Sequence, residues 1–224
     1  MNGNTRVLIV YYTFSQQAGR VAAAVAKAME DRGCAVFRAQ LQFTDPGYVM
    51  SHESVPMKTP ALKFVRMLPG QARRKTGEIQ IPEEAQSGDY DLVVLGGPTW
   101  WLTANMPIRS YLKSDAAKAV LNGKPFGGYS VSRRYWRGNV STMHKMGEAA
   151  GGTWLDETHF VSEGNQVKSM LSWLSYMRYG EHRERSFGLK LPLPNLKPDF
   201  EDQARDFANR LLDLAAQKRA SVPS

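Results

Sequence analysis

The sequence predicts an α/β fold in which a mostly parallel sheet is covered by helices on both faces. Short apolar runs rich in valine, isoleucine and tyrosine alternate along the chain with longer amphipathic segments. The first forty residues already contain one strand–helix–strand unit, and residues 91–96 have the continuous apolar character of a strand buried on both faces. Strands that alternate with helices favour a parallel sheet, because each crossover helix returns the chain to the same end.

Each core element has its own local justification. The expected strands are apolar runs bounded by turn residues, at residues 6–12, 35–41, 91–96, 124–131 and 154–161. The expected helices carry apolar residues at helical spacing, at residues 19–32, 106–114, 139–150 and 199–217. Gly33 follows the first of these helices and is a suitable terminator, and Pro107 is compatible with the first turn of the second.

Two irregular segments, at about residues 43–81 and 163–193, interrupt this alternation. We interpret them as insertions within a single domain that spans residues 1–224. The first contains four prolines and a short expected helix at 61–68, and the second has apolar residues at helical spacing from Val167 to Met177. These helices could form a lid, a dimer contact or an amphipathic contact with a membrane surface. We favour a lid or a homodimer contact.

Composition limits the classes of partner. The formal net charge is +8, which favours anionic partners, although a solvated basic surface is the alternative. No nucleic-acid-binding motif is present, so we expect no nucleic acid partner. The single cysteine excludes an internal disulfide, and no apolar run approaches the roughly 18 residues that span a membrane. We therefore expect a soluble, cytoplasmic protein.

Several familiar catalytic patterns are absent from the sequence. Residues 128–132 lack the closing glycine of a hydrolase nucleophile elbow. There is no dinucleotide-binding glycine fingerprint after the first strand and no phosphate-binding P-loop. The four histidines, His52, His144, His159 and His182, lack metal-ligand spacing, so we expect no metal site.

The candidate site comprises the loops that follow the first, third and fourth expected strands, because parallel sheets of this kind bind ligands beyond their carboxyl ends. The first loop leads into a helix N-terminus, where unpaired backbone N–H groups and the helix dipole favour an anion such as a phosphate monoester. An ordinary capped turn is the alternative. The first loop consists of Thr13, Phe14, Ser15, Gln16, Gln17 and Ala18.

The second and third loops offer aromatic and basic side chains. Two glycines precede the second loop and permit close approach of the backbone, while tryptophan provides a flat face for stacking. Adjacent side chains rarely point the same way, so one of its two tryptophans is expected to pack in the core or at a subunit contact. The third loop could close over a ring, neutralise a phosphate or bind a nucleotide substrate, or be a solvated turn. The two loops contain Pro98, Thr99, Trp100, Trp101 and Leu102, and then Ser132, Arg133, Arg134 and Tyr135.

Two of these segments resemble the flavodoxin-like superfamily. Residues 8–15 and 95–101, followed by Met106 and Pro107, are most similar to its NAD(P)H-dependent FMN reductases and quinone reductases. The resemblance covers roughly residues 6–41, 88–162 and 199–216. It implies a three-layer sandwich around a five-stranded parallel sheet in the order 2-1-3-4-5, with flavin mononucleotide (FMN) as the cofactor.

The resemblance also implies roles for individual residues. Thr13, Ser15 and Gln17 would lie around the FMN phosphate, within a cofactor-binding loop of residues 13–18, and residues 98–102 would line the isoalloxazine ring. The far wall would consist of Ser132, Arg133, Arg134 and Tyr135. Independently of the resemblance, we expect substrate to contact Trp101, Arg134 and Tyr135. The chain departs from the superfamily at Gln16, where a glycine is usual, and at Ala18, where a threonine is usual. The first change restricts the backbone, and the second removes one phosphate hydrogen bond.

These features lead to one expected function and two alternatives. We expect an FMN-dependent oxidoreductase that passes electrons from NAD(P)H through the flavin to a quinone-like or other flat acceptor. No catalytic side chain need be conspicuous, because the cofactor carries the chemistry. The alternatives are a flavodoxin-type electron carrier that docks on a partner protein, and a flavin-free module that uses the same fold for interaction.

Overall fold

A parallel β-sheet forms the centre of the molecule in the computed structural model, which describes residues 5–48, 56, 58–161, 166–181, 183–186, 189–191 and 196–221. Five parallel strands lie in the order β2-β1-β5-β7-β8, which confirms the expected order 2-1-3-4-5. Their bounds are β1 (Arg6–Tyr11), β2 (Ala35–Gln40), β5 (Leu92–Trp100), β7 (Pro125–Ser132) and β8 (Thr153–Val161). A sixth short strand, β6 (Thr103–Ala104), pairs antiparallel with the end of β5 and was not expected.

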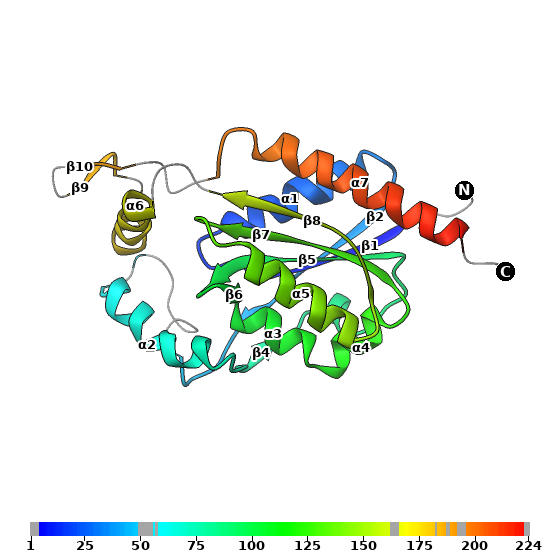
Figure 1. Ribbon diagram of the computed structural model, residues 1–224, viewed down its shortest axis with the longest axis horizontal. Coiled ribbons are helices and arrows are strands. Elements are labelled where there is room, and N and C mark those ends of the chain that lie inside the picture. The colour runs from blue at the N-terminus through cyan, green and yellow to red at the C-terminus, as the bar shows by residue number, and fades with distance from the viewer. Residues whose placement is uncertain are drawn as a thin grey trace.

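Helices cover both faces of this sheet (Figure 1). One face carries α1 (Gln17–Glu30) and α7 (Phe200–Ala220), and the other carries α3 (Met106–Leu112), α4 (Asp115–Leu121) and α5 (Arg137–Ala149). Alternate residues of β1 point to opposite faces, so Val7 and Ile9 pack with α1 and α7, while Leu8 and Val10 pack in the other core layer. The strands are apolar throughout because both of their faces are buried.

Local chemistry explains where several helices begin and end. Gly33, just beyond α1, has φ 82°, a left-handed conformation that suits glycine. Asn105 caps α3 by accepting a hydrogen bond from the Ile108 N–H at 3.0 Å. Ser114 caps α4 in the same way through the Ala117 N–H at 3.2 Å. The sequence did not predict α4, although the pair Ser114 and Asp115 is a recognisable start signal.

The first expected insertion contains β3 (Gln42–Phe43), α2 (Pro60–Ala72) and β4 (Ile79–Gln80), with β3 and β4 paired antiparallel, and a 3₁₀ turn, η2 (Glu83–Ala85), follows it. Helix α2 is longer than the expected 61–68 and continues through Pro69. It ends in a Schellman motif, because the Lys75 N–H donates to the Gly70 carbonyl and the Arg74 N–H donates to the Gln71 carbonyl.

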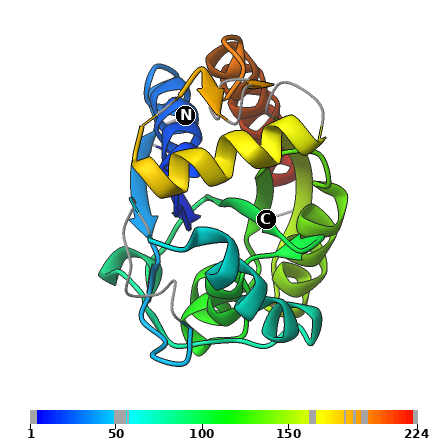
Figure 2. The same ribbon diagram turned by 90° about the vertical axis from the view of Figure 1, so that its left-hand side faces the viewer.

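The second expected insertion contains α6 (Gln166–Tyr179) and the short strands β9 (Arg185–Ser186) and β10 (Leu189–Lys190). Both α6 and α2 lie at the carboxyl end of the sheet, where α6 crosses in front of the strand ends (Figures 1 and 2). Residues 49–55, 57, 162–165, 182, 187–188 and 192–195, which include His52 and His182, lie outside the described residues. None of the described helices is both long enough and apolar enough to cross a bilayer.

Candidate functional site

Three loops meet at the carboxyl edge of the sheet, because β1, β5 and β7 are adjacent and parallel. Tyr11 pairs with Gly96, and Gly96 pairs with Tyr129, so the three strands reach this edge in register. The loops after β1, β5 and β7 are the three that the sequence analysis predicts to form the candidate site. The structure therefore brings all three sets of predicted residues to one end of the molecule.

The loop after β1 leads into α1, whose N-terminus has no side-chain cap. Gln16 is the N-cap residue of α1, its side chain makes no capping hydrogen bond, and the first turn contains no acidic residue. The Thr13 side chain is buried, and its Oγ1 atom has no hydrogen-bond partner among the described residues. A buried hydroxyl beside the positive end of a helix is an arrangement that an anion would complete.

The other residues of this loop are mostly engaged with the protein itself. Gln17 donates to the Ser15 carbonyl at 3.3 Å and accepts from the Leu196 N–H at 3.3 Å, so its amide ties α1 to the segment before α7. The Ala18 carbonyl accepts a hydrogen bond from the Tyr129 hydroxyl at 2.9 Å. Phe14 packs against the core cluster beneath the loop.

Gln16 adopts the backbone conformation that a glycine would favour. Its φ is 63°, which lies in the left-handed region that costs an ordinary residue roughly 1–2 kcal/mol. Gln16 therefore holds this conformation at an energetic cost, and its side chain is exposed.

A hydrogen-bond network organises the strand ends of β5 and β7. Asn139 of α5 donates to the Gly97 carbonyl at 3.1 Å and to Ser130 Oγ at 2.8 Å. Ser130 Oγ lies 3.0 Å from Thr99 Oγ1, and Asn105 donates to the Pro98 carbonyl at 3.0 Å. These buried contacts make the loop after β5 a preorganised element rather than a free turn.

The two adjacent tryptophans take different roles. Trp100 is buried and packs edge-on against Tyr12, with ring centroids 5.5 Å apart, so it occupies the core position that the sequence allowed for one of the pair. Its ring belongs to the core cluster rather than to an open wall of the site. Trp101 is half-buried and has φ 48°, and Leu102 follows with φ 65° and 62% exposure.

Close packing against α5 holds this left-handed pair. A Cβ atom on Gly138 would lie 1.8 Å from the Leu102 carbonyl oxygen, so only glycine permits this approach. Thr103 Oγ1 lies 2.9 Å from Thr142 Oγ1 and adds a second tie between the loop and α5. The strained conformation at Trp101 and Leu102 is thus maintained by tertiary contacts.

In the loop after β7, one side chain contacts α6 and the next two are exposed at the edge of the site. Arg133 donates to Met170 Sδ and lies over the Trp173 ring, 5.6 Å from its centroid, so this side chain anchors α6. Burial lowers the pKa of Arg133. Ser132 Oγ is buried without a hydrogen-bond partner in the described part of the chain. Arg134 and Tyr135 are exposed.

Sequence reasoning missed the residues that support the loops. Asn105 immediately precedes the Met106–Pro107 pair and carries a recognisable N-cap signal. Asn139 has no local signal, because its partners at Gly97 and Ser130 come from two other elements. Met170 and Trp173 were assigned to an insertion helix and not to the wall of the site.

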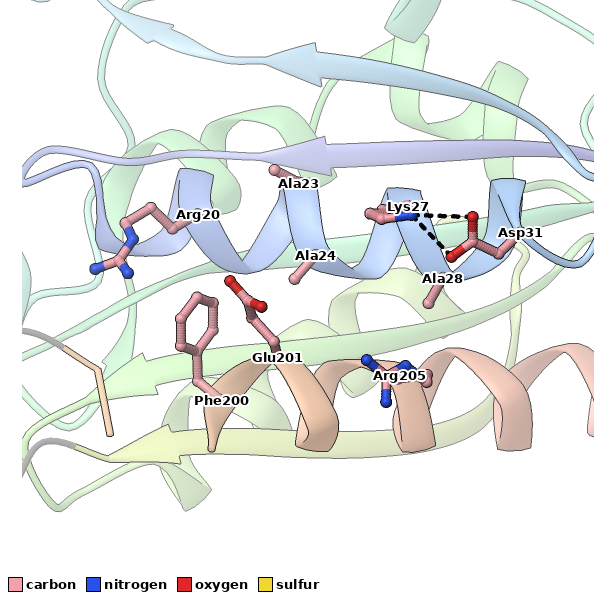
Figure 3. Close-up of a pocket in the computed structure, with 9 residues that line it drawn as sticks. All are labelled: Arg20, Ala23, Ala24, Lys27, Ala28, Asp31, Phe200, Glu201 and Arg205. Atoms are coloured by element: carbon pink, nitrogen blue, oxygen red, sulfur yellow. Dashed lines mark hydrogen bonds and ion pairs between the residues drawn. The ribbon is translucent and has the colours of Figure 1, made fainter. Parts of the chain in front are cut away.

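A separate hollow lies between α1 and α7, away from the three loops (Figure 3). Alanines form part of its lining, the Arg20 guanidinium stacks 4.9 Å from the Phe200 ring centroid, and Lys27 pairs with Asp31 at 3.0 Å. Its third cation, Arg205, pairs with Asp202 at 2.9 Å, so all three cations are engaged by protein groups, and Asp31 and Glu201 add negative charge to the lining. This hollow is therefore less suited to an anion than the α1 N-terminus. Among the described residues, no three potential metal ligands cluster together.

Comparison with known proteins identifies the fold. The sequence matches no protein-family model and no curated protein. The structure is similar to a flavoprotein from Lactobacillus acidophilus solved in complex with FMN, with 18% identity, a TM-score of 0.51, and coverage of 69% of this chain and 93% of that one. It is also similar to oxidised flavodoxin 2 from Bacillus cereus, with 11% identity, a TM-score of 0.50, and coverage of 93% and 99%.

A third similar structure belongs to a larger protein. Rubredoxin oxygen:oxidoreductase from Desulfovibrio gigas aligns with 11% identity and a TM-score of 0.52, over 96% of this chain and 37% of that one. At such low identities these likenesses establish a shared architecture. The chain has the flavodoxin-like fold.

Proposed function

We propose that this flavodoxin-like chain binds FMN at the carboxyl edge of its sheet and acts as a flavin-dependent redox protein. The observation that carries the proposal is the uncapped N-terminus of α1 beside the buried, unpartnered Thr13 hydroxyl. The proteins of similar structure include a flavoprotein in complex with FMN, which supports the same ligand here.

The residues present fit the phosphate of FMN. The α1 N-terminus would supply backbone N–H groups, Thr13 Oγ1 would donate one hydrogen bond, and no acidic side chain in the first turn would repel the anion. The Ser15 hydroxyl would be a further donor. Ala18 contributes no hydroxyl, so the phosphate would be held by fewer side-chain donors than in the resembling superfamily.

The ring of FMN would lie between the loops after β5 and β7. Trp101 and Leu102 would form one wall in the left-handed conformation that Gly138 permits, and Ser132 would supply a buried hydroxyl from the other. When bound, FMN supplies reversible electron transfer, while the surrounding residues position it and exclude water. Thr99, Ser130 and Asn139 would orient these walls without touching the reacting atoms.

The finer proposal is an NAD(P)H-dependent oxidoreductase with a quinone-like or other flat acceptor. Exposed Arg134 and Tyr135 support it, because a guanidinium and an aromatic ring beside the site suit an anionic, aromatic nucleotide. Trp101 would stack on the same bound molecule. Arg133 would act indirectly, by holding α6 next to the site.

An electron carrier that docks on a partner protein is the second candidate. Leu102 is 62% exposed and Tyr135 is 56% exposed, and both belong to the loops at the strand-end edge. A docking partner would cover such apolar groups, which favours a carrier. Stopped-flow mixing with NADH or NADPH separates the candidates, because a carrier should react negligibly with either.

The absorption spectrum of the purified protein, with and without added FMN, tests the proposal. Flavin bands that remain with the protein after desalting are expected. Thr13→Val should weaken FMN binding about tenfold, because it removes one hydrogen bond to a charged group, whereas Thr44→Val at an exposed site should leave it unchanged. A colourless protein that takes up no FMN would refute the proposal.

A further inference from the structure

The two insertion helices share an unusual charge pattern. Residues 58–77 contain no aspartate or glutamate, and neither do residues 166–180. The basic residues of these two stretches are Lys58, Lys63, Arg66, Arg73, Arg74, Lys75, Lys168 and Arg178. All 21 acidic residues of the chain therefore lie outside these two stretches.

The two helices lie together and enclose an apolar groove. Figure 2 shows α2 and α6 at the same end of the molecule, and Arg178 of α6 donates to the Lys58 carbonyl just before α2. The groove has a volume of about 440 Å³. Its apolar lining comes from both helices: Pro60, Ala61, Leu62, Leu171, Leu174 and Tyr179.

Large apolar side chains on the same two helices face solvent. Leu62 is 52% exposed and Val65 is 54% exposed, while Val167 on α6 is 67% exposed. Val167, Leu171 and Leu174 follow helical spacing and lead to Arg178, so one stripe of α6 is apolar and ends in a cation. An apolar groove on helices that also expose large apolar side chains is typical of an interaction site.

We propose that the end face formed by α2 and α6 docks on the surface of an anionic lipid bilayer. Leu62, Val65 and Val167 would enter the boundary between headgroups and acyl chains, and Lys58 and Arg66 would lie at the lipid phosphates. Helices that carry apolar groups and cations but no acidic residue suit an anionic interface, although Glu181 lies just beyond the end of α6. The helices would lie in the plane of the interface, in keeping with the lack of a spanning helix among those described.

Sedimentation with vesicles tests the docking surface, and it is independent of flavin binding because it can be run with and without added FMN. The full chain should co-sediment with vesicles of phosphatidylcholine and phosphatidylglycerol at low salt. It should bind far less to phosphatidylcholine alone, and raising the salt concentration should release it. An absence of binding to the anionic vesicles at low salt would overturn the proposal.

Matched variants test the location of the surface. Lys58→Glu with Arg66→Glu should reduce binding by more than about tenfold, since each basic residue near an anionic surface contributes about a fivefold effect. Lys118→Glu with Arg205→Glu changes the net charge equally but lies on α4 and α7, so it should have a much smaller effect. Equal losses in the two pairs would show attraction by net charge alone and would overturn the proposal.

A charge-neutral pair tests the apolar part. Leu62→Ser with Val65→Ser should reduce vesicle binding about tenfold while circular dichroism and the melting temperature stay unchanged, because both side chains are exposed. Sedimentation velocity without lipid supplies the remaining test. A dimer that dissociates in this same variant would show that a second copy of the chain covers the face, and would overturn the proposal.

Discussion

Gln16 shows how a single residue can hold a conformation that its side chain opposes. Its φ of 63° places it in the left-handed region at the start of α1. Two hydrogen bonds on the helix side of Gln16 fix this turn, because Tyr129 donates to the Ala18 carbonyl and the Arg20 N–H donates to the Gln16 carbonyl. The surrounding structure therefore imposes the conformation and Gln16 bears the strain.

Gln16→Gly should stabilise the protein by about 1 kcal/mol, because glycine adopts this conformation without steric cost. Urea unfolding followed by circular dichroism measures the change. Ala23→Gly, at an exposed position inside α1, is the control and should destabilise by about 1 kcal/mol. If both glycines destabilise to the same extent, the strain at Gln16 is not real.

His159 of β8 and Trp136 of the loop after β7 form a stacked pair. Their ring centroids are 3.9 Å apart and their planes differ by 6°. Burial, and to a smaller extent the positive charge of Arg137, lower the pKa of His159. The folded protein therefore favours the neutral imidazole, which stacks on the indole without carrying a charge into this region.

Lowering the pH should reduce the free energy of unfolding of this protein, because His159 becomes protonated. Its pKa is lower in the folded than in the unfolded state, so stability is full above about pH 6.5 and falls as the pH drops toward the folded-state pKa. His159→Phe keeps a stacked ring without the titration. Melting temperatures at about pH 8 and about pH 5 should differ less in this variant than in the parent protein.

His144→Phe is the matched control for that measurement. His144 also stacks on a tryptophan, Trp154, with ring centroids 4.7 Å apart. The control retains His159, so its melting temperature should fall between about pH 8 and about pH 5 at least as much as that of the parent protein. If the fall is the same in His159→Phe as in the parent, a group other than His159 causes it.

At the scale of elements, a buried arginine joins the first insertion to the core. Arg109 of α3 is 1% exposed and donates to Gln71 Oε1 at 2.9 Å, to the Lys75 carbonyl at 2.7 Å and to the Ala104 carbonyl. Burial, reinforced by nearby Arg74, lowers the pKa of Arg109 to about 10. The C-terminal end of α2 favours a cation there, so this charge is stabilised by carbonyl groups and a helix dipole.

Arg109→Lys should destabilise the protein by about 2 kcal/mol or more, because an ammonium cannot serve all of these acceptors from one position and leaves buried carbonyls unpaired. Urea unfolding measures this loss, and hydrogen exchange should show faster opening of α2. Arg205→Lys, at an exposed ion pair with Asp202, should change stability by less than about 0.5 kcal/mol. Similar losses in the two variants would contradict the anchoring role.

At the scale of the whole molecule, ligand binding and stability should be linked. A cofactor held by loops after β1, β5 and β7 binds the folded chain and not the unfolded one. The site is assembled from segments that are far apart in the sequence, so its occupancy reports on the fold as a unit. Stabilisation by added flavin would therefore test whether the three loops form one site in the folded chain.

FMN at about a hundredfold excess over its Kd should raise the free energy of unfolding by about 2.7 kcal/mol. Thermal unfolding followed by circular dichroism measures the rise. Riboflavin, which lacks the phosphate, should stabilise the protein less, because it leaves the α1 N-terminus and Thr13 without their anion. Equal effects of the two flavins would show that the phosphate does not bind there.

Much of the fold was predictable because its signals are local. Apolar runs such as residues 91–96 identify buried strands, and the alternation of strands and helices requires a parallel sheet. The order of the strands came from the resemblance at residues 8–15 and 95–101, and the structure confirms it. The short elements β3, β4, β6 and α4 were missed, because two to seven residues carry too little periodicity to be recognised.

Strand and helix patterns in the sequence were enough to predict the layers and the edge at which the three candidate loops meet, whereas the strand order came from the resemblance to the flavodoxin-like superfamily. Only the folded structure shows where the loop side chains lie: Trp100 is buried in the core, Trp101 is half-buried against it, and Arg133 contacts Met170 and Trp173 on α6. It also brought α2 and α6 together into one apolar, basic face. The physical reason is that strand and helix patterns arise between near neighbours in the chain, whereas these contacts join residues tens of positions apart.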